Sequence, residues 1–267
     1  MISDNAAREI RKVSEVARYL WDKGWAERNA GNITVNLTGM VQAPSDLSRL
    51  PYHSGAAYPR ESAGMVFWAK RTQERIRDLI EPKRGGCVMR IDDQAAGYHV
   101  LWGGDPVVPD QVTSEFISHV LIHVDQEKRG TGHRAVVHTH PIELIALTHH
   151  PEYNSDDLKF THALWRMLPE VRAFIPRGVA VAPYLLPGSK RLGEATMERL
   201  RTRDVVLWKK HGATSSGADV LEAFDFLDVA NKGATVFLKC LAAGYMPEGL
   251  HDHEMQELVE VFNLAPG

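Results

Sequence analysis

Hydrophobic positions along the chain follow two periods, one typical of helices and one typical of strands. Residues 6–23 carry a helical stripe that ends before Gly24, and residues 31–37 alternate like a strand after a Gly-Asn turn. The stripe consists of Ile10, Val13, Val16, Ala17, Leu20 and Trp21. Further helices are predicted at 113–128, 156–168, 189–202 and 219–242, and a short one begins at Pro141. Further strands are predicted at 65–69, 86–91, 96–103, 135–140, 178–182 and 205–212.

Helices and strands interleave along the chain without the strict alternation of a parallel βαβ fold. We therefore expect an α/β fold with a central mixed sheet flanked by helices. Residues 39–62 are rich in Pro, Ser, Gly and Tyr, which indicates a long surface loop, and the charged segment that begins at Lys70 could open a helix. No stretch has the composition of a linker, so residues 1–267 are predicted to form a single domain.

The composition is that of an ordinary globular protein and excludes several classes of function. Hydrophobic residues make up 44% of the chain, charged residues make up 24%, and the net charge is −3. This balance gives no field that would draw the chain onto nucleic acid or an anionic membrane. The longest apolar runs are too short to span a bilayer, and proline interrupts them. With only Cys87 and Cys240, and an N-terminus without a secretory pattern, the chain is expected to be cytoplasmic.

Histidine is the unusual component, with 13 residues, and three of them stand at the ends of predicted strands. His138 and His140 are two residues apart, so on a strand both imidazoles project from the same face. This spacing suits one metal ion, although the same pattern also occurs without a metal. His211 ends another predicted strand and is followed by the small Gly212. Three imidazoles on strand ends with one open position are typical of a catalytic zinc site.

The other histidines fit structural roles better. His99 lies among apolar residues of a predicted strand, and we expect it to belong to the core or to support the site. His119 and His123 are four apart on one helix face and could chelate a metal, but they lack an acidic neighbour at the spacing of zinc-protease helices. The histidines expected to be exposed are His149, His150, His162, His251 and His253.

Two further groups of residues could carry chemistry. Thr113-Ser114-Glu115 starts a predicted helix, where hydroxyl and carboxylate groups commonly act as caps. The same residues could bind an anion and supply Glu115 as a general base. Residues 29–32, Asn-Ala-Gly-Asn, form a turn whose amides could bind phosphate, although by itself the sequence is that of an ordinary turn. The residues alone leave both interpretations open.

Several segments, taken in order, resemble the class II aldolase/adducin family. They are KGWAERNAGNIT, AGYHVLWGG, TSEF, VVHTHPIELIALTHH, PYLLPGSKRLG and VLWKKHG, and the likeness runs nearly end to end. The HxH followed by LIALT and the late LWxxHG are specific at this spacing. The AGYHVLWG segment and the loop at 39–62 resemble the rhamnulose 1-phosphate branch of the family more than its fuculose and ribulose branches.

The resemblance implies a reversible retro-aldol cleavage of the sugar phosphate L-rhamnulose 1-phosphate to dihydroxyacetone phosphate and L-lactaldehyde. His138, His140 and His211 match the family's ligands for one Zn²⁺ per subunit. Glu115 matches a carboxylate that binds zinc in the free enzyme and acts as the base. Glu170 matches a second glutamate that reaches a neighbouring subunit's site as proton donor, which implies a homotetramer with shared sites.

The same match implies the contacts to substrate. Asn29, Asn32, Thr113 and Ser114 match contacts to phosphate and hydroxyl groups. The family's glycine-rich phosphate loop is replaced here by Lys70-Arg71-Thr72-Gln73-Glu74. Thr72 can supply the loop's hydroxyl, whereas Arg71 and Gln73 stand where glycines let backbone amides approach phosphate. Either Lys70 or Arg71 contacts phosphate directly, or the loop is displaced and the affinity or the substrate has changed.

Elementary chemistry supports the aldolase interpretation. Zinc bound by three neutral imidazoles keeps its full charge and can stabilise the enediolate left when a C–C bond beside a ketone breaks. One alternative is an epimerase, dehydratase or decarboxylase that uses the same imidazoles on a different sugar acid or phosphate. Another is a non-catalytic, adducin-like interaction module, which would be expected to have lost its metal ligands.

Overall fold

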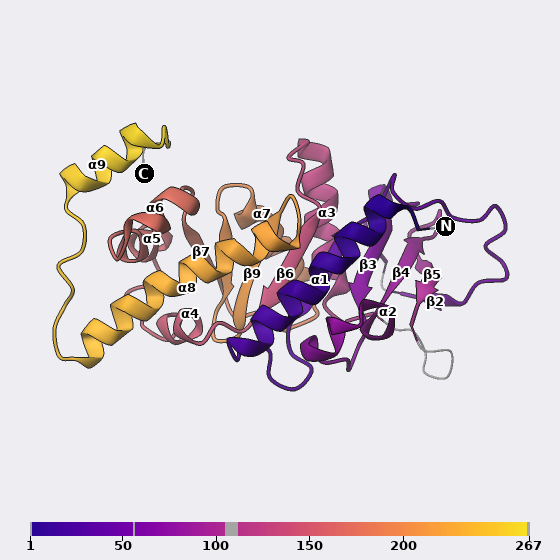
Figure 1. The fold of residues 1–267 in the computed structure, drawn as a ribbon, viewed down its shortest axis with the longest axis horizontal. Helices are drawn as coiled ribbons and strands as arrows, with labels where there is room; N and C mark the ends of the chain where they lie inside the picture. The colour runs from indigo at the N-terminus through magenta and orange to yellow at the C-terminus, as the bar shows by residue number, and fades with distance from the viewer. Residues whose placement is uncertain (1, 56, 105–111, 266–267) are drawn as a thin grey trace. The chain divides into compact units, whose positions relative to one another are not determined.

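The computed structural model describes residues 2–55, 57–104 and 112–265, and within them the strands form one nine-stranded sheet. The strands, labelled in Figure 1, are β1 (Asn32–Asn36), β2 (Tyr52–Ser54), β3 (Val66–Lys70), β4 (Gly86–Ile91), β5 (Gly97–Gly103), β6 (Ala135–Thr139), β7 (Val179–Ala182), β8 (Val205–Trp208) and β9 (Gly212–Gly217). Their order is β2-β5-β4-β3-β1-β6-β9-β8-β7. β1 pairs antiparallel with β3, whereas β7 and β8 run parallel, so the prediction of an α/β fold with a mixed sheet is confirmed.

Helices flank the strands, as predicted. They are α1 (Asp4–Asp22), α2 (Pro82–Gly85), α3 (Phe116–Arg129), α4 (Ile142–Leu147), α5 (Asp157–Trp165), α6 (Pro169–Phe174), α7 (Lys190–Leu200), α8 (Val220–Ala242) and α9 (Asp252–Val261), with 3₁₀ helices η1 (Arg60–Ser62) and η2 (Ile76–Ile80). Among the described residues, no helix combines the length and the hydropathy needed to cross a bilayer.

The contacts within the chain group it into two compact units. The first holds Met1–Thr139, Leu186–Met197 and Ser216–Ala223, and the second holds His140–Leu185, Glu198–Ser215 and Phe224–Gly267. The boundary falls between Thr139 and His140, inside the HxH pattern. The prediction of a single domain over residues 1–267 stays a prediction.

α1 covers one face of the strands of the first unit (Figure 1). It begins after Ser3, whose Oγ accepts a hydrogen bond from the Ala6 N–H at 3.2 Å and so caps the helix. The predicted stripe is buried except for Trp21, which is 42% exposed. Trp21 lies about 100° around the helix from Leu20, outside the buried stripe, and the Arg77 guanidinium lies 4.6 Å from its ring centroid.

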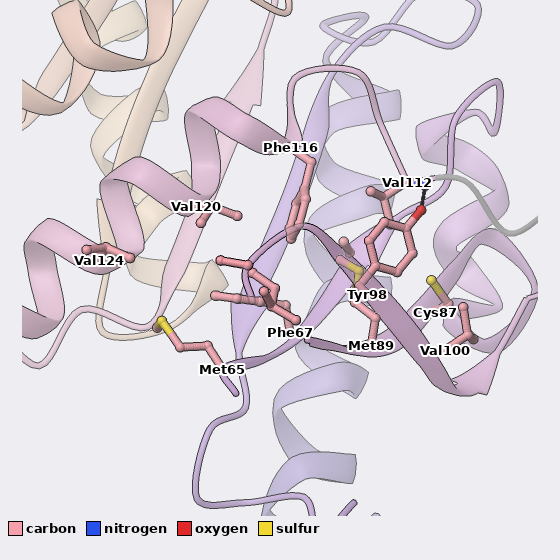
Figure 2. Close-up of a cluster of buried hydrophobic side chains, with 13 residues drawn as sticks. Met65, Phe67, Cys87, Met89, Tyr98, Val100, Val112, Phe116, Val120 and Val124 are labelled. Atoms are coloured by element: carbon pink, nitrogen blue, oxygen red, sulfur yellow. Dashed lines mark hydrogen bonds between the residues drawn. The ribbon is translucent and has the colours of Figure 1, made fainter. Parts of the chain in front are cut away.

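The opposite face of these strands packs against α3 through a hydrophobic core, shown in Figure 2. Alternate residues of β3 and β4 point into it because successive side chains on a strand face opposite sides. Phe116, the first residue of α3, meets the ring of Phe67 edge-on at 5.7 Å, and Tyr98 lies 6.4 Å away. The Tyr98 hydroxyl accepts a hydrogen bond from the Val112 N–H at 3.1 Å, which fixes the chain just before α3.

His119 and His123 attach α3 to β1 through one hydroxyl. Both imidazoles are buried, and both hydrogen-bond to Thr34 Oγ1, from His119 Nδ1 at 2.9 Å and from His123 Nε2 at 2.8 Å. Burial lowers the pKa of each imidazole to about 3, because charging it would cost its desolvation. Their four-residue spacing therefore serves helix–sheet packing in this structure.

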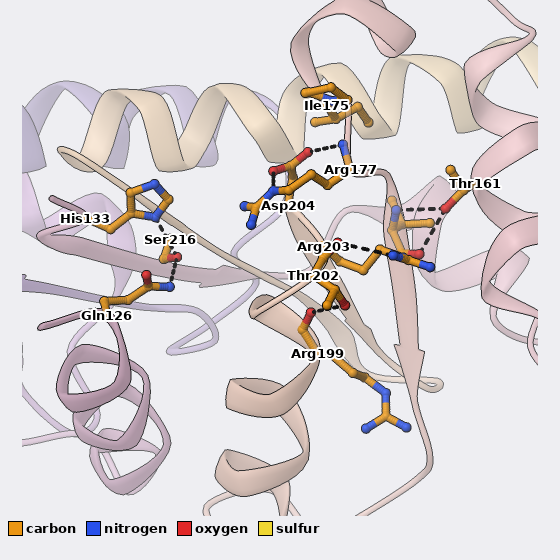
Figure 3. Close-up of polar contacts among 12 residues, drawn as sticks. Gln126, His133, Thr161, Ile175, Arg177, Arg199, Thr202, Arg203, Asp204 and Ser216 are labelled. Carbon is orange, nitrogen blue, oxygen red and sulfur yellow. Dashed lines mark hydrogen bonds and ion pairs between the residues drawn. The ribbon is translucent and has the colours of Figure 1, made fainter. Parts of the chain in front are cut away.

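In the second unit, β7 is attached to α5 and to β8 by polar contacts (Figure 3). The Thr161 hydroxyl donates to the Val179 carbonyl at 3.0 Å and accepts from the Val179 N–H at 2.9 Å. The buried carboxylate of Asp204 accepts from Arg177 Nε at 2.7 Å and from the Arg177 backbone N–H at 2.8 Å. In the first unit, Figure 3 shows a smaller network in which Gln126 donates to Ser216 Oγ at 3.0 Å.

Several predicted boundaries were wrong. Residues 39–62 are not only loop, because β2 pairs with β5 and η1 follows it. The helix predicted at 156–168 is α5 and ends earlier, at Trp165, because Pro169 disfavours a helical conformation in the residue before it. A separate helix, α6, begins at Pro169 and was not predicted. The segment after Lys70 opens with turns and the 3₁₀ helix η2 rather than an α-helix. The strand predicted at 205–212 ends at Trp208, and β9 and α9 were not predicted.

The buried imidazoles generate a prediction about acid stability. Unfolding restores the ordinary pKa of about 6.5, so their contribution is complete above that pH and is lost as the pH falls toward about 3. Urea denaturation should show that the free energy of unfolding of the wild type falls more steeply between about pH 6 and 4 than that of His123→Gln, by about 1.4 kcal/mol per pH unit.

Substituting the exposed His149 by Gln provides the control and should leave the wild-type slope unchanged. Equal slopes for wild type and His123→Gln would contradict the prediction.

Candidate active site

Three polar side chains of the first unit meet where β1 lies beside β6. The antiparallel register of these strands places Asn32 opposite His138. Asn32 Nδ2 donates a hydrogen bond to Glu115 Oε2, and His138 Nε2 lies 3.8 Å from the same oxygen. An amide, a carboxylate and an imidazole therefore converge in a buried place.

Burial controls the charge of Glu115. Glu115 is 7% exposed, and the loss of water around its carboxyl group raises the pKa of that group to about 7. The Lys70 charge and the Asn32 hydrogen bond oppose this shift. Burial in turn lowers the pKa of Lys70 to about 8, against the attraction of Glu115 and Glu74. Glu115 can therefore both take up and release a proton near neutral pH.

The sequence predicted a helix that starts at residue 113, whereas Glu115 lies just before α3. The helix begins at Phe116, and the Glu115 carbonyl accepts from the Ser118 N–H at 2.9 Å. Its side chain makes no capping bond, so the carboxylate can reach Asn32. The Thr113 hydroxyl accepts from the Glu115 N–H at 3.3 Å, and the Thr113 N–H donates to the Lys70 carbonyl at 3.1 Å. Thr113 is buried, whereas Ser114 is exposed.

The turn at residues 28–31 lies against the backbone of His138. Gly31 has a φ of +78°, and a Cβ atom there would lie 3.2 Å from the His138 carbonyl oxygen, so only glycine fits without movement. Lys70 Nζ donates to the Asn29 carbonyl at 2.9 Å and ties the turn to the end of β3. The two asparagines predicted to contact substrate thus lie beside charged groups, Asn29 beside Lys70 and Asn32 beside Glu115.

The loop at Lys70–Glu74 keeps a glycine-like backbone without glycine. Gln73 has a φ of +64°, a conformation that costs energy for a side chain with a Cβ atom. Arg71 is 2% exposed, and its Nη1 donates to the Arg84 carbonyl at 3.0 Å and lies 3.7 Å from Glu74 Oε1. Its guanidinium thus contacts the protein's own backbone, while Thr72 is partly exposed.

The second unit contributes His140 and His211. Their ring centroids are 5.1 Å apart, with the planes at 65°. His211 lies in the turn after β8 and not on a strand, and its N–H donates to the Trp208 carbonyl at 2.9 Å. Lys210, in the same turn, has a φ of +63°, and its N–H donates to the Thr148 hydroxyl at 2.8 Å. These bonds fix the turn that presents His211.

The candidate ligand atoms of His138, His140 and His211 all lie within 4.8 Å of one another. Chain geometry contributes to this proximity, because only Thr139 separates the first two. The Thr139 hydroxyl donates to the Trp25 carbonyl at 2.6 Å, a bond that anchors the end of β6. Three imidazoles are a donor set that suits zinc.

Glu170 is a predicted site residue whose side chain has no partner among the described residues. It is exposed in the first turn of α6 and makes no hydrogen bond or ion pair with the described part of the chain. The supporting residues Thr139 and Thr148 were not predicted, because their partners are distant in the chain and no local pattern marks them. Lys70 was predicted only as a possible phosphate contact, whereas here it donates to the Asn29 carbonyl.

Five of the remaining histidines were expected to be exposed, and the structure confirms this. His149, His150, His162, His251 and His253 are exposed. His99 is partly buried on β5, where its ring lies 5.0 Å from that of Tyr52. Within the described residues, the three-histidine group is the one cluster of histidine, cysteine and carboxylate side chains close enough to hold an ion.

Comparison with curated proteins shows relatives over nearly the whole length. A rhamnulose-1-phosphate aldolase from Bacteroides thetaiotaomicron is 43% identical over 264 residues, which cover 97% of this chain and 95% of that protein. A rhamnulose-1-phosphate aldolase from Klebsiella pneumoniae is 34% identical and covers 92% of this chain and 90% of that protein.

Solved structures share the fold. A sugar-phosphate aldolase from Thermotoga maritima superposes with a TM-score of 0.77 at 31% identity, over 92% of this chain and all of that one. An L-fuculose 1-phosphate aldolase superposes with a TM-score of 0.61 at 18% identity, over 99% of each chain, a likeness of fold alone. The family model described as the class II aldolase and adducin N-terminal domain matches residues 11–238. Since that match spans most of the sequence, the chain belongs to the class II aldolase and adducin family.

Proposed function

We propose that this protein cleaves L-rhamnulose 1-phosphate reversibly to dihydroxyacetone phosphate and L-lactaldehyde in a metal-dependent retro-aldol reaction. The observation that carries the proposal is the buried carboxylate of Glu115, with a pKa of about 7, beside His138. The identity to rhamnulose-1-phosphate aldolases supports the choice of substrate. We also propose a cytoplasmic location, which the low count of two cysteines supports.

The proposed metal ligands are His138, His140 and His211, and the proposed ion is Zn²⁺. The donor set fits, because neutral imidazoles are preferred zinc ligands and three of them leave a position for substrate. A divalent ion held there would stabilise the negative charge that develops on the ketone oxygen when the C–C bond breaks. Glu115 is placed to complete the ligand set in the absence of substrate, since its carboxylate lies beside His138.

Two glutamates are proposed to move the protons. In the direction of cleavage, the hydroxyl on the leaving side loses its proton as it becomes the aldehyde, and the carbon on the other side gains one. We assign the carbon proton to Glu115, because a carboxyl with a pKa near 7 can give and take a proton at neutral pH. We assign the hydroxyl proton to Glu170 of a neighbouring subunit, since its exposed position on α6 leaves it available to another chain.

The phosphate group is proposed to bind beside the start of α3. Thr113 and Ser114 offer hydroxyl and backbone groups there, and the Thr113 N–H attaches this segment to the end of β3. The turn with Asn29 and the amide of Asn32 complete the proposed substrate contacts. Arg71 and Thr72 belong to the adjoining loop, where Thr72 can supply a hydroxyl and Arg71 holds the loop to the Arg84 carbonyl.

Substituting His140 by Ala tests the metal site. We expect the metal content of the purified protein and the release of dihydroxyacetone phosphate in a coupled assay to fall together, because two imidazoles hold an ion weakly. His149→Ala, at an exposed position, should retain both. Full stoichiometric metal and full turnover in His140→Ala would contradict the site assignment, and a metal-loaded wild type that releases no dihydroxyacetone phosphate would contradict the reaction.

The altered loop can be tested through substrate affinity. Removing Arg71 (Arg71→Ala) or the hydroxyl of Thr72 (Thr72→Val) should raise KM for the phosphate ester about tenfold and leave kcat within a few-fold, the pattern of lost uniform binding. Unphosphorylated rhamnulose should show no such change. Unchanged KM in both variants would mean that the loop does not serve the phosphate.

The proposed assembly is a homotetramer, a closed head-to-tail ring in which each site takes Glu115 from one chain and Glu170 from the next. Glu115→Ala and Glu170→Ala should each lose about 10²–10⁴-fold in activity, the usual contribution of proton transfer. Both variants should still bind metal.

Mixing the two variants under conditions that dissociate and reassemble the oligomer should restore part of the activity, because some junctions then combine an intact Glu115 with an intact Glu170. Reassembled wild type provides the reference. Activity that stays at the level of the separate variants would show that Glu170 serves its own chain.

A further inference from the structure

Arg172 is a buried cation on the same short helix as Glu170. It is 1% exposed, and its guanidinium lies 4.3 Å from the centroid of the Trp165 ring. Its Nη1 donates to the Pro176 carbonyl at 3.2 Å, and its Nη2 donates to the Ala265 carbonyl. These partners come from three segments: the end of α5, the chain just after α6, and the chain after α9.

The segment that ends at Ala265 is attached to the same helices at its other end. The Leu250 N–H donates to the Arg166 carbonyl at 2.8 Å, and Arg166 Nη1 donates back to the Leu250 carbonyl at 2.5 Å. Arg166 also pairs with Asp252, the first residue of α9. α9 itself buries no residue, and a cavity of about 250 Å³ separates its inner side from Trp165 and Arg172. The polar contacts at the two ends therefore hold this segment in place.

α6 has few other means of keeping its orientation. It is 6 residues long, too short to be stable alone, and no side chain caps its start. Its buried residues are Val171 and Arg172, and Phe174 is 58% exposed. Since Glu170 makes no hydrogen bond with the described residues, its carboxylate is aimed by the backbone of α6 alone.

We propose that Arg172 is a positioning residue for Glu170, and that it acts by fastening α6 to the C-terminal segment Leu250–Ala265. The proposal rests on the catalytic role proposed for Glu170. A planar guanidinium suits this task because its fork can bond two carbonyls at fixed angles while its face covers an aromatic ring. Its partners here are two carbonyls and a ring rather than a carboxylate, so the bonds fix geometry without a paired charge.

The first test compares kinetic constants of the full-length, metal-loaded enzyme. Arg172→Gln should lower kcat about ten- to a hundredfold, because misplacing a catalytic group by about 1 Å has effects of this size. KM should change by less than about twofold and metal content should not change. Arg172→Lys, which keeps the charge without the planar fork, should recover only part of kcat.

Arg177→Gln is the matched control. It removes another arginine of the second unit, whose partner Asp204 is buried, while the Arg177 backbone N–H still donates to that carboxylate. We expect it to lower the melting temperature by a similar amount and to leave kcat unchanged. A loss of kcat in Arg177→Gln equal to that in Arg172→Gln would overturn the proposal, because general destabilisation would then explain both.

The decisive measurement is the effect of Arg172→Gln in a Glu170→Gln background. If Arg172 acts through Glu170, the double variant should have the kcat of Glu170→Gln, whereas an independent role would lower kcat by the same factor in both backgrounds. Full activity in Glu170→Gln alone would contradict the function proposed for Glu170. An inactive Glu170→Gln together with a fully active Arg172→Gln would overturn only the present inference.

If Arg172→Gln does not fold, Arg166→Gln provides a second variant. The Arg166 side chain is 36% exposed, and its substitution releases the other end of the same segment. It should show a smaller loss of kcat with KM unchanged, again absent in the Glu170→Gln background. An unchanged kcat in Arg166→Gln would also overturn the proposal.

Discussion

The alternation of side chains at the end of β6 is the constraint on which the candidate site depends. β6 ends at Thr139, so the strand directs the side chains of His138 and Thr139 to opposite faces, and His140 is the first residue beyond it. Thr139 uses its hydroxyl to donate to the Trp25 carbonyl at 2.6 Å, so the residue between the two imidazoles anchors the strand end. A slip of one residue in the register with β1 would turn His138 away from Asn32 and Glu115. The strand thus fixes His138 beside Asn32 and Glu115, and His140 follows two residues later in the chain.

Burial then determines the chemistry of the groups around that strand end. Glu115 has a pKa near 7 because loss of water outweighs the attraction of Lys70 and the hydrogen bond from Asn32. The same loss of water lowers the pKa of Lys70 to about 8. Both shifts have the same main cause, the loss of water around a charged group. A more exposed carboxylate would stay ionised and would be a poorer proton donor.

Periodic segments were predictable from sequence, and segments stabilised by distant contacts were not. The spacing of Leu20 and its neighbours indicated α1, and β4 was predicted with its observed bounds. β9 was missed because its sequence, GATSSG, holds a single strand-forming residue, Thr214, and it is a strand because it pairs with β8 and is buried throughout. His211 was placed on a strand because a pattern of apolar residues does not show where a turn begins.

In the candidate site, too, some residues could be proposed from the sequence and the positions of others could not. His138, His140 and Glu115 could be identified because their spacing and local sequence are informative. The orientation of Arg71 could not, because the long side chain has several possible partners and the Arg84 carbonyl that it contacts is 13 residues away. The positive φ of Gln73 was equally hidden, since glutamine does not indicate a left-handed backbone.

Buried cations that bond to backbone carbonyls recur at three irregular segments of this chain. Lys70 donates to the carbonyl of Asn29, Arg71 to that of Arg84, and Arg172 to those of Pro176 and Ala265. Carbonyls in turns and at helix ends lack a partner within their own helix or strand, and a donor from another element can satisfy them. A long cationic side chain can reach them from such a neighbouring element. The three segments carry the turn with Asn29, the altered phosphate loop and the helix with Glu170. Because a turn, a loop and a helix of 6 residues have few hydrogen bonds of their own, these cations help to hold the segments that carry the proposed chemistry.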